Sequence, residues 1–221
     1  MRTLSVLAAC LLAGVAHATT VSKLAFTLEL PDGWVEAPPE ALQQLHDAMK
    51  QQAPGQETAK YDYAFQSNAG PPWFTYPYVL VKVRSSGRPS EQDLADLPAA
   101  AAKEGVPGPM RHDPATNIVW MSSTIQVAPV GAVDSLTAFI PTERGFVDVY
   151  AYAPAADYPP LKPALEKLIG SIVIAPALKY QAHRADDAGA GGGFDFKRLG
   201  LILGAGVLIG VLVGFFRRRK T

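Results

Sequence analysis

An uncharged apolar stretch near the C-terminus constrains this chain more than any other feature. Residues Leu199 to Phe216 run for eighteen positions without a charged side chain, and the basic residues Arg217 to Lys220 follow directly. As an α-helix, eighteen residues at about 1.5 Å each span roughly 27 Å, close to the hydrocarbon thickness of a bilayer. We therefore expect one transmembrane helix over 199–216, followed by a basic cytoplasmic tail over 217–221.

The N-terminus has the three parts of a secretory signal peptide over residues 1–18. Arg2 supplies the positive charge, Leu4 to Val15 is apolar, and Ala16-His17-Ala18 is the small-x-small pattern before a cleavage site. A cleaved signal would export the chain from Thr19 until residue 199 stops transfer, and the basic tail agrees with the positive-inside rule. This predicts a single-pass protein of the cytoplasmic (inner) membrane, with its domain on the periplasmic side.

Cys10 leaves an alternative open for that N-terminus. Leu7-Ala8-Ala9-Cys10 resembles a bacterial lipobox, in which the cysteine becomes a lipid-modified N-terminus. The apolar run continues past Cys10, however, and few residues separate it from Arg2. These two features favour an ordinary signal peptide, and a diacylglycerol mass on Cys10 would decide for the lipoprotein.

The exported part of the chain contains no cysteine, because Cys10 is the single one in the sequence. It therefore has no disulfide framework and must bury its own core, for which the roughly 160 residues of 19–179 are ample. There is no Asn-x-Ser/Thr glycosylation site either. This combination is typical of a bacterial envelope protein.

Charge and composition divide the exported part further. Residues 19–198 carry 15 basic and 20 acidic side chains, a net charge of about −5, which argues against nucleic acid as a partner. Residues 180–198 include Ala-Gly-Ala-Gly-Gly-Gly at 188–193 and form a glycine-rich linker between the domain and the membrane.

The domain over 19–179 mixes strand and helix patterns. Apolar residues at spacings of three and four predict helices, and alternating residues predict strands. Helices are expected from Pro38-Pro39 to about Ala53, from the capping box of Ser90 and Asp93 to about Lys103, and from Pro159-Pro160 to Gly170. Strands are expected over 24–30, 61–66, 77–85, 117–127, 133–140, 146–152 and 171–174.

Three further local features accompany these elements. Pro98 is expected to make the second helix short or irregular. The stretch Pro141 to Gly145 is expected to turn a hairpin between two strands. Tight turns between consecutive strands predict an α+β fold with an antiparallel sheet sandwiched by helices.

The order of these elements resembles the PsbP-like superfamily and the similar DcrB-type envelope proteins of bacteria. The opening strand ends in Pro31-Asp32-Gly33-Trp34, a strand and helix follow at 78–103, a meander comes next, and Gly170 to Ile174 closes the domain. The resemblance covers about residues 23–175. It implies the same α+β sandwich and proteins that bind or assemble partners rather than catalyse a reaction, and it brings no functional residues to this chain.

The C-terminal tail has a resemblance of its own. Gly191-Gly192-Gly193, an apolar span and an arginine cluster resemble GlyGly-CTERM sorting signals, which rhomboid-type proteases cut. The chain departs from that pattern, because Phe194 to Arg198 stands between the glycines and the apolar span. A mature mass ending near Gly193 would support processing.

No set of residues in the sequence points to catalysis, to a cofactor or to a metal. His46 is expected on the solvent side of a helix, His112 in a loop before Asp113-Pro114, and His183 in the linker. None has a partner at the spacing of a metal site. The sequence thus predicts no catalytic, cofactor-binding or metal-binding residues. The alternative is a membrane-tethered hydrolase or ligand-binding enzyme that uses scattered residues such as Asp148, Tyr150 and His112.

Two groups of residues could form contact surfaces. The segment Pro71 to Tyr78 holds four aromatic residues, Trp73, Phe74, Tyr76 and Tyr78. It would form either an exposed aromatic ledge for a partner or, as we favour, the start of a core strand with alternate rings buried. Trp34 and Trp120 are expected in the core.

Gly206, Gly210 and Gly214 form a small-residue ridge on the expected membrane helix, as do Gly200 and Gly204. Such a ridge fits a homodimer, and ordinary membrane-helix composition is the alternative. Together these features predict a membrane-anchored, non-enzymatic binding or assembly module of the bacterial envelope with a protein partner.

Overall fold

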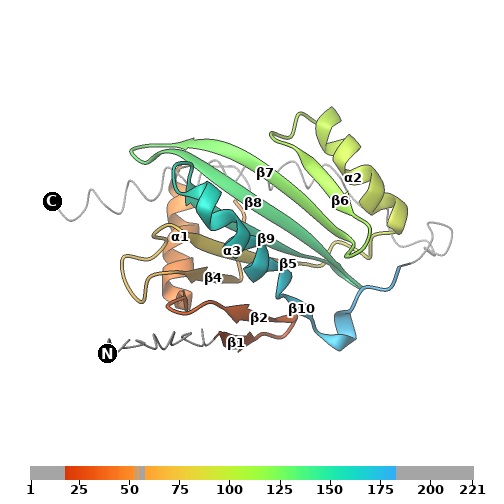
Figure 1. Ribbon diagram of the computed structural model, residues 1–221, viewed down its shortest axis with the longest axis horizontal. Coiled ribbons are helices and arrows are strands. Elements are labelled where there is room, and N and C mark those ends of the chain that lie inside the picture. Colours follow the sequence, from red (N-terminus) through yellow and green to blue (C-terminus); the bar gives the residue numbers. More distant parts are fainter. Residues whose placement is uncertain (1–17, 53, 55–57, 183–221) are drawn as a thin grey trace, which may run out of the picture.

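The computed structural model describes residues 18–52, 54 and 58–182 (Figure 1). The predictions of a signal peptide (apart from residue 18), a membrane span with a glycine ridge and a basic tail, and most of the expected linker with His183, lie outside these residues. The elements are, in chain order, β1 (Thr19–Ser22), β2 (Phe26–Leu30), β3 (Val35–Glu36), α1 (Pro39–Gln52), β4 (Tyr63–Gln66), β5 (Tyr78–Arg84), α2 (Glu91–Lys103), β6 (Met110–Asp113), β7 (Ile118–Val127), β8 (Gly131–Thr142), β9 (Gly145–Pro154), α3 (Tyr158–Gly170), β10 (Val173–Ile174) and a 3₁₀ turn, η1 (Pro176–Leu178).

A seven-stranded antiparallel sheet is the centre of the domain. Its strand order is β3-β4-β5-β9-β8-β7-β6, and β1, β2 and β10 form a separate three-stranded antiparallel sheet. The longest pairing joins β8 to β9 through the predicted hairpin, whose last residue, Gly145, has φ +148°. The α+β class and the antiparallel sheet with three helices are therefore confirmed.

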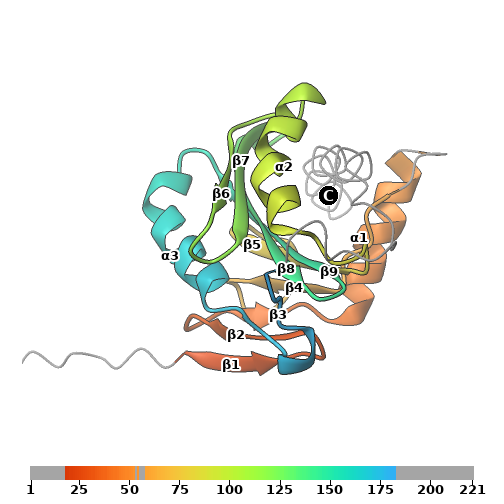
Figure 2. The ribbon, with the colours of Figure 1, turned by 90° about the vertical axis from the view of Figure 1, so that its right-hand side faces the viewer.

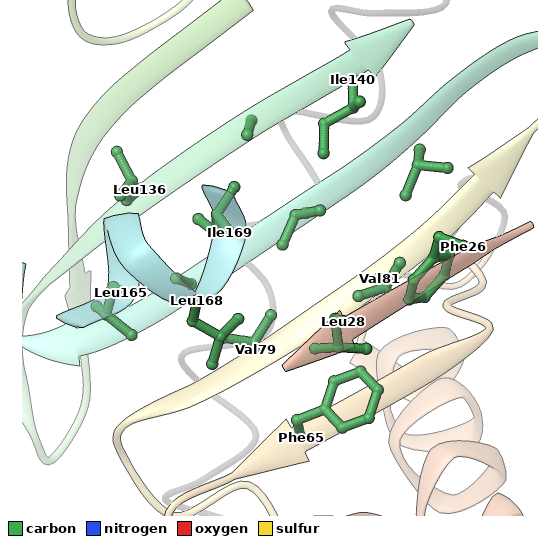
Figure 3. Packing of buried hydrophobic residues seen from close by; sticks show 14 of the residues in the cluster. Phe26, Leu28, Phe65, Val79, Val81, Leu136, Ile140, Leu165, Leu168 and Ile169 are labelled. Atoms are coloured by element: carbon green, nitrogen blue, oxygen red, sulfur yellow. The ribbon is translucent and has the colours of Figure 1, made fainter. Parts of the chain in front are cut away.

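One face of the large sheet is covered by α3 and by the small sheet. Figure 3 shows Leu165, Leu168 and Ile169 of α3 lying over apolar residues of β5, β8 and β9. Beside them, Phe26 and Leu28 of β2 pack near Phe65, Val79 and Val81 of the large sheet. The three-stranded sheet therefore covers part of this face, whereas the sequence predicts that helices alone cover the large sheet.

The opposite face is covered by α1 at one end and by α2 at the other. Leu45 and Met49 of α1 are buried against a tyrosine-rich part of β5 and β9. Leu94 and Leu97 of α2 are buried with apolar residues of β7, β8 and β9. Figure 2 shows α1 and α2 on the side of the sheet opposite α3.

The predicted helices agree with the structure to within a few residues, with one correction. The capping box of Ser90 and Asp93 is present in both directions, at 3.0 and 2.8 Å. The prediction that Pro98 shortens or disturbs α2 is wrong, because α2 runs for 13 residues through it. Buried Leu94 and Leu97 hold the helix to the sheet, and such packing offsets the hydrogen bond that proline removes.

Short strands correct the sequence predictions further, since the two-residue strand β3 is not expected from the sequence. Residues 110–113, expected as a loop around His112, form the edge strand β6, paired with β7. Residues 19–22, for which no strand was expected, form β1. Both lack the alternating apolar pattern by which strands are recognised in a sequence. Within 18–52, 54 and 58–182, none of the helices is both long and apolar enough to cross a membrane.

Candidate ligand-binding pocket

A pocket lies on the α3 side of the large sheet, between α3 and the strands at the β6 edge. Its volume is about 140 Å³. The side chains that matter for recognition are Arg111 of β6, Trp120 and Ser122 of β7, Leu136 of β8, and Lys162 and Glu166 of α3. Leu136 joins the pocket to the core, because it also belongs to the apolar cluster under α3 (Figure 3).

The register of the strands places the pocket residues on one face. Arg111 pairs with Trp120, and Ser122 pairs with Leu136, so each pair points to the same side of the sheet. The Arg111 guanidinium carbon lies 5.6 Å from the centre of the Trp120 ring, within the range of a cation–π contact. The contact orients a cation beside a large aromatic surface.

Helix α3 supplies the opposite wall through two charged residues one turn apart. Lys162 Nζ lies 4.0 Å from Glu166 Oε1, and the two side chains are 47% and 41% exposed. An exposed i,i+4 pair of this kind stabilises a helix by only about 0.3–0.5 kcal/mol. Both side chains can therefore turn toward a ligand at little cost to the fold.

The backbone at Pro109, just before β6, forms one end of the pocket. Ser122 N donates a hydrogen bond to Pro109 O at 3.1 Å. Gly108 has φ +94°, and a Cβ there would collide with the Ser122 carbonyl oxygen. A glycine is required at this position because it combines a positive φ with a close backbone approach.

Asp113, a charged residue near the pocket, already has hydrogen-bond partners, whereas Arg111 has no ion pair in the described part of the chain. The Asp113 carboxylate accepts hydrogen bonds from Ala115 N and Thr116 Oγ1, each at 3.0 Å. These bonds, the backbone one above all, lower the pKa of Asp113, and the positive charge of Arg111 adds to the effect. In the described part of the chain Arg111 forms no ion pair with a carboxylate. Its guanidinium is available to an anion.

Tyr158, at the start of α3, lies next to the pocket lining. Burial raises the pKa of its hydroxyl, and the side chain of Ser122 opposes that rise. The region around Ser122 therefore presents hydroxyl groups as well as apolar surface. The arrangement can bind a small molecule with one charged end and one apolar end.

The prediction that Trp120 and Trp34 lie in the core is confirmed in part. Both side chains are half-buried and pack against the core under α3, and Trp120 also lines the pocket. The alternation of β7 indicates on which face of the sheet Trp120 lies. Val119 and Met121, on either side of it, are buried on the opposite face.

The residues of the enzyme alternative divide into two groups. Asp148 and Tyr150 of β9 lie together, with Tyr150 Oη donating to Asp148 Oδ2 at 3.4 Å, on the face opposite α3. His112 is on β6, which is separated from β9 by β7 and β8, a distance of roughly 14 Å at about 4.8 Å per strand. The structure does not bring these three residues into one site.

The buried carboxylate of Asp148 is held by a structural partner. Burial raises its pKa, and Arg84, which donates Nη2 to Oδ1 at 3.0 Å, opposes that rise. Burial likewise raises the pKa of Tyr150 well above its ordinary value. The ion pair of Arg84 and Asp148 lies inside the domain, since the two side chains are 8% and 0% exposed.

The histidines and acidic residues give no metal centre within residues 18–52, 54 and 58–182, where no three His, Cys, Asp or Glu side chains cluster. His46 of α1 is half-buried rather than on the solvent side, and its Nδ1 is buried without a hydrogen-bond partner there. Packing of α1 against the sheet brings it inward.

The aromatic segment 71–78 forms core rather than an exposed ledge. Phe74 and Tyr78 are 5% and 1% exposed, and Tyr76 stacks on Tyr78 with ring centres 5.0 Å apart. Trp73 is partly buried against the same cluster. Gln66 fixes the loop, because its Oε1 accepts from Phe74 N at 2.7 Å. The interpretation with alternate rings buried is therefore confirmed.

Comparisons with known proteins give structural similarity but no match in sequence. No protein-family model and no curated protein matches the sequence. Among solved structures, the chain is similar to cyanobacterial PsbP (CyanoP) from Synechocystis sp. PCC 6803, at 10% identity and a TM-score of 0.38. The match covers 76% of this chain and 99% of that one. It assigns neither a site nor an activity to this chain.

Proposed function

We propose that this chain is a non-enzymatic binding or assembly module, anchored in the cytoplasmic membrane of a bacterium with its domain in the periplasm. The observation that carries the binding role is the pocket between α3 and the β6 edge. It combines a cation within 5.6 Å of the centre of an aromatic ring with two more charged side chains and an apolar wall. These groups serve recognition, because they hold a ligand without supplying a nucleophile paired with a base.

The sequence supports the membrane part of the proposal. Residues 1–18 have the pattern of a signal peptide, and 199–216 have the length and composition of a membrane span. The linker 180–198 would hold the domain within a few nanometres of the bilayer. The likeness to PsbP-like and DcrB-type proteins, and cleavage of the tail after the GlyGly-CTERM pattern, remain part of this proposal.

The alternative of a membrane-tethered hydrolase or ligand-binding enzyme is less well supported. Its candidate residues Asp148 and Tyr150 lie beside a buried arginine, and His112 is several strands away. A general base must come within hydrogen-bonding reach of the proton that it removes. These three residues do not meet that condition together.

Cross-linking in cells, followed by purification from gently solubilised membranes and mass spectrometry, tests the proposal. We expect one abundant envelope protein that cross-links to the full chain and is lost when 19–179 is deleted while the signal, linker and membrane span are kept. Recovery of the chain from the soluble periplasmic fraction would contradict the membrane anchor. Absence of any partner above background would favour a small ligand as the molecule bound.

The glycine ridge adds a proposal about self-association. Gly206, Gly210 and Gly214 recur every four residues, so they would lie on one side of a membrane helix and let a second copy approach closely. Gly210→Leu should then abolish dimerisation of the span in a membrane reporter assay. Val211→Leu, in neither glycine ridge, is the control. Equal signals from the wild-type span and Gly210→Leu would assign the glycines to ordinary composition.

A further inference from the structure

We propose that the pocket between α3 and the β6 edge binds a small organic carboxylate with an apolar body about the size of a benzene ring. This deepens the proposed binding role by naming a ligand class, and it rests on that role. The inference comes from the charge of the pocket, its volume and the arrangement of Arg111 and Trp120.

The charge of the lining selects a monoanion. Two of its side chains are cationic, Arg111 and Lys162, and one is anionic, Glu166. Lys162 already lies beside Glu166, and Asp113 accepts hydrogen bonds from Ala115 and Thr116, which lower its pKa together with the charge of Arg111. Arg111 is therefore the cation of the lining that has no ion pair in the described part of the chain. A dianion such as a phosphate monoester would bring its second negative charge toward Glu166. A single carboxylate matches the net charge without that repulsion.

The geometry of Arg111 suits a carboxylate in particular. A planar guanidinium presents parallel N–H groups along its edges, which match the two oxygens of a carboxylate. The guanidinium carbon lies 5.6 Å from the centre of the Trp120 ring, and no ion pair occupies its N–H groups in the described part of the chain. The ring also restricts the arginine side chain, which lowers the entropy cost of binding.

The volume and the apolar residues define the rest of the ligand. A cavity of about 150 Å³ lined by aliphatic and aromatic residues holds one benzene molecule. The pocket here has about 140 Å³, and Trp120 and Leu136 supply apolar surface. The body of the ligand is therefore a single ring or a short branched chain, whereas a sugar would leave its hydroxyl groups against apolar atoms.

Fluorine NMR of ligand binding to the full-length chain in lipid nanodiscs tests the inference. The probes are para-fluorobenzoate, its neutral counterpart para-fluorobenzamide and its cationic counterpart para-fluorobenzylammonium. We expect the benzoate to bind about tenfold more tightly than the amide, because a charge-assisted hydrogen bond is stronger than a neutral one. Added salt should weaken benzoate binding, since the pocket is open to solvent.

Variants of Arg111 distinguish ligand binding in the pocket from binding to the nanodisc or to another site on the protein. Arg111→Gln should remove the preference for benzoate, and Arg111→Glu should reverse it in favour of para-fluorobenzylammonium. Arg88→Gln is the matched control, because Arg88 is paired with Glu143 at 3.1 Å and is not part of the lining. A reversal cannot arise from unfolding, so the test does not depend on stability alone.

Three results would overturn the inference: no binding of para-fluorobenzoate, equal binding of the amide, or unchanged benzoate binding in Arg111→Gln. A failure here is distinguishable from failure of the proposed function. The cross-linking experiment does not depend on the pocket and decides separately whether 19–179 recruits an envelope partner, whereas the fluorine NMR experiment decides whether the pocket binds a carboxylate.

Discussion

Arg84 of β5 and Asp148 of β9 form a buried ion pair, in which Arg84 Nη2 donates to Asp148 Oδ1 at 3.0 Å. The side chains are 8% and 0% exposed, and the Arg84 guanidinium carbon also lies 5.0 Å from the centre of the Phe146 ring. Asp148 faces Lys82 directly across the ladder, so the pair with Arg84 is diagonal. It fixes two neighbouring strands at the centre of the large sheet.

Replacing Arg84 with methionine tests how much this ion pair contributes to the free energy of unfolding. The substitution keeps the length of the side chain but leaves Asp148 buried without its cation. Removing one partner of a buried pair costs about 3–5 kcal/mol. We therefore expect Arg84→Met to lower the free energy of unfolding by about that amount in a urea titration at neutral pH. Arg88→Met should cost only about 0–1 kcal/mol, because the pair of Arg88 with Glu143 is partly exposed.

The cost of Arg84→Met should also depend on pH. Burial raises the pKa of Asp148, and Arg84 opposes that rise, so the pKa is higher still in the variant. A folded-state pKa above the unfolded value, about 3.9 for aspartate, means that stability is lost as pH rises through the folded value. The difference between wild type and Arg84→Met should therefore be smallest near about pH 4 and grow toward neutral pH. A difference that stays constant over this range would contradict the pKa argument.

Phe26 tests whether the small sheet is an integral part of the domain. Its side chain is 0% exposed, and its ring makes an edge contact with Tyr63 at 5.6 Å between centres. Phe26→Ala should lower the free energy of unfolding by about 3–5 kcal/mol, as for other large-to-small core changes. Leu24→Ala is the control, since Leu24 is 92% exposed and its loss should change stability by less than about 0.5 kcal/mol. Equal effects would show that β2 does not belong to the core.

The elements with a strong local pattern could be predicted from the sequence. The alternation in β5 and β7, the paired prolines at the start of α1 and α3, and the capping box at Ser90 each specify their element without tertiary information. The two sheets could not be separated in this way. Whether β2 pairs with β10 or joins the large sheet depends on contacts between residues about 146 positions apart. No local signal records such a pairing.

The candidate pocket was missed for a related reason. Its main cation, Arg111, lies on a strand of four residues whose pattern is polar, so the segment resembled a loop. Without β6, the sequence offers Trp120 a cross-strand neighbour on the β8 side alone and favours a place in the core for a tryptophan in mid-strand. The signal that did exist was the alternation of β7, which sets Trp120 opposite to Val119 and Met121. It could indicate the face of Trp120 but not the residues across from it.

Gly108 links the fold to the pocket and gives a prediction with a close control. Gly105 and Gly108 stand in the loop between α2 and β6 with φ +69° and +94°, so alanine is strained at both. Only at 108 would the new Cβ collide with backbone, at Ser122, whereas at 105 nothing lies within 4 Å. Gly105→Ala should cost about 1–2 kcal/mol, the strain of a left-handed residue. Gly108→Ala should cost more and should weaken binding of para-fluorobenzoate, because the collision moves Pro109 and Ser122 at the end of the pocket. Unfolding by urea and fluorine NMR measure the two effects, and equal stability of the two variants would show that the loop yields without disturbing β7.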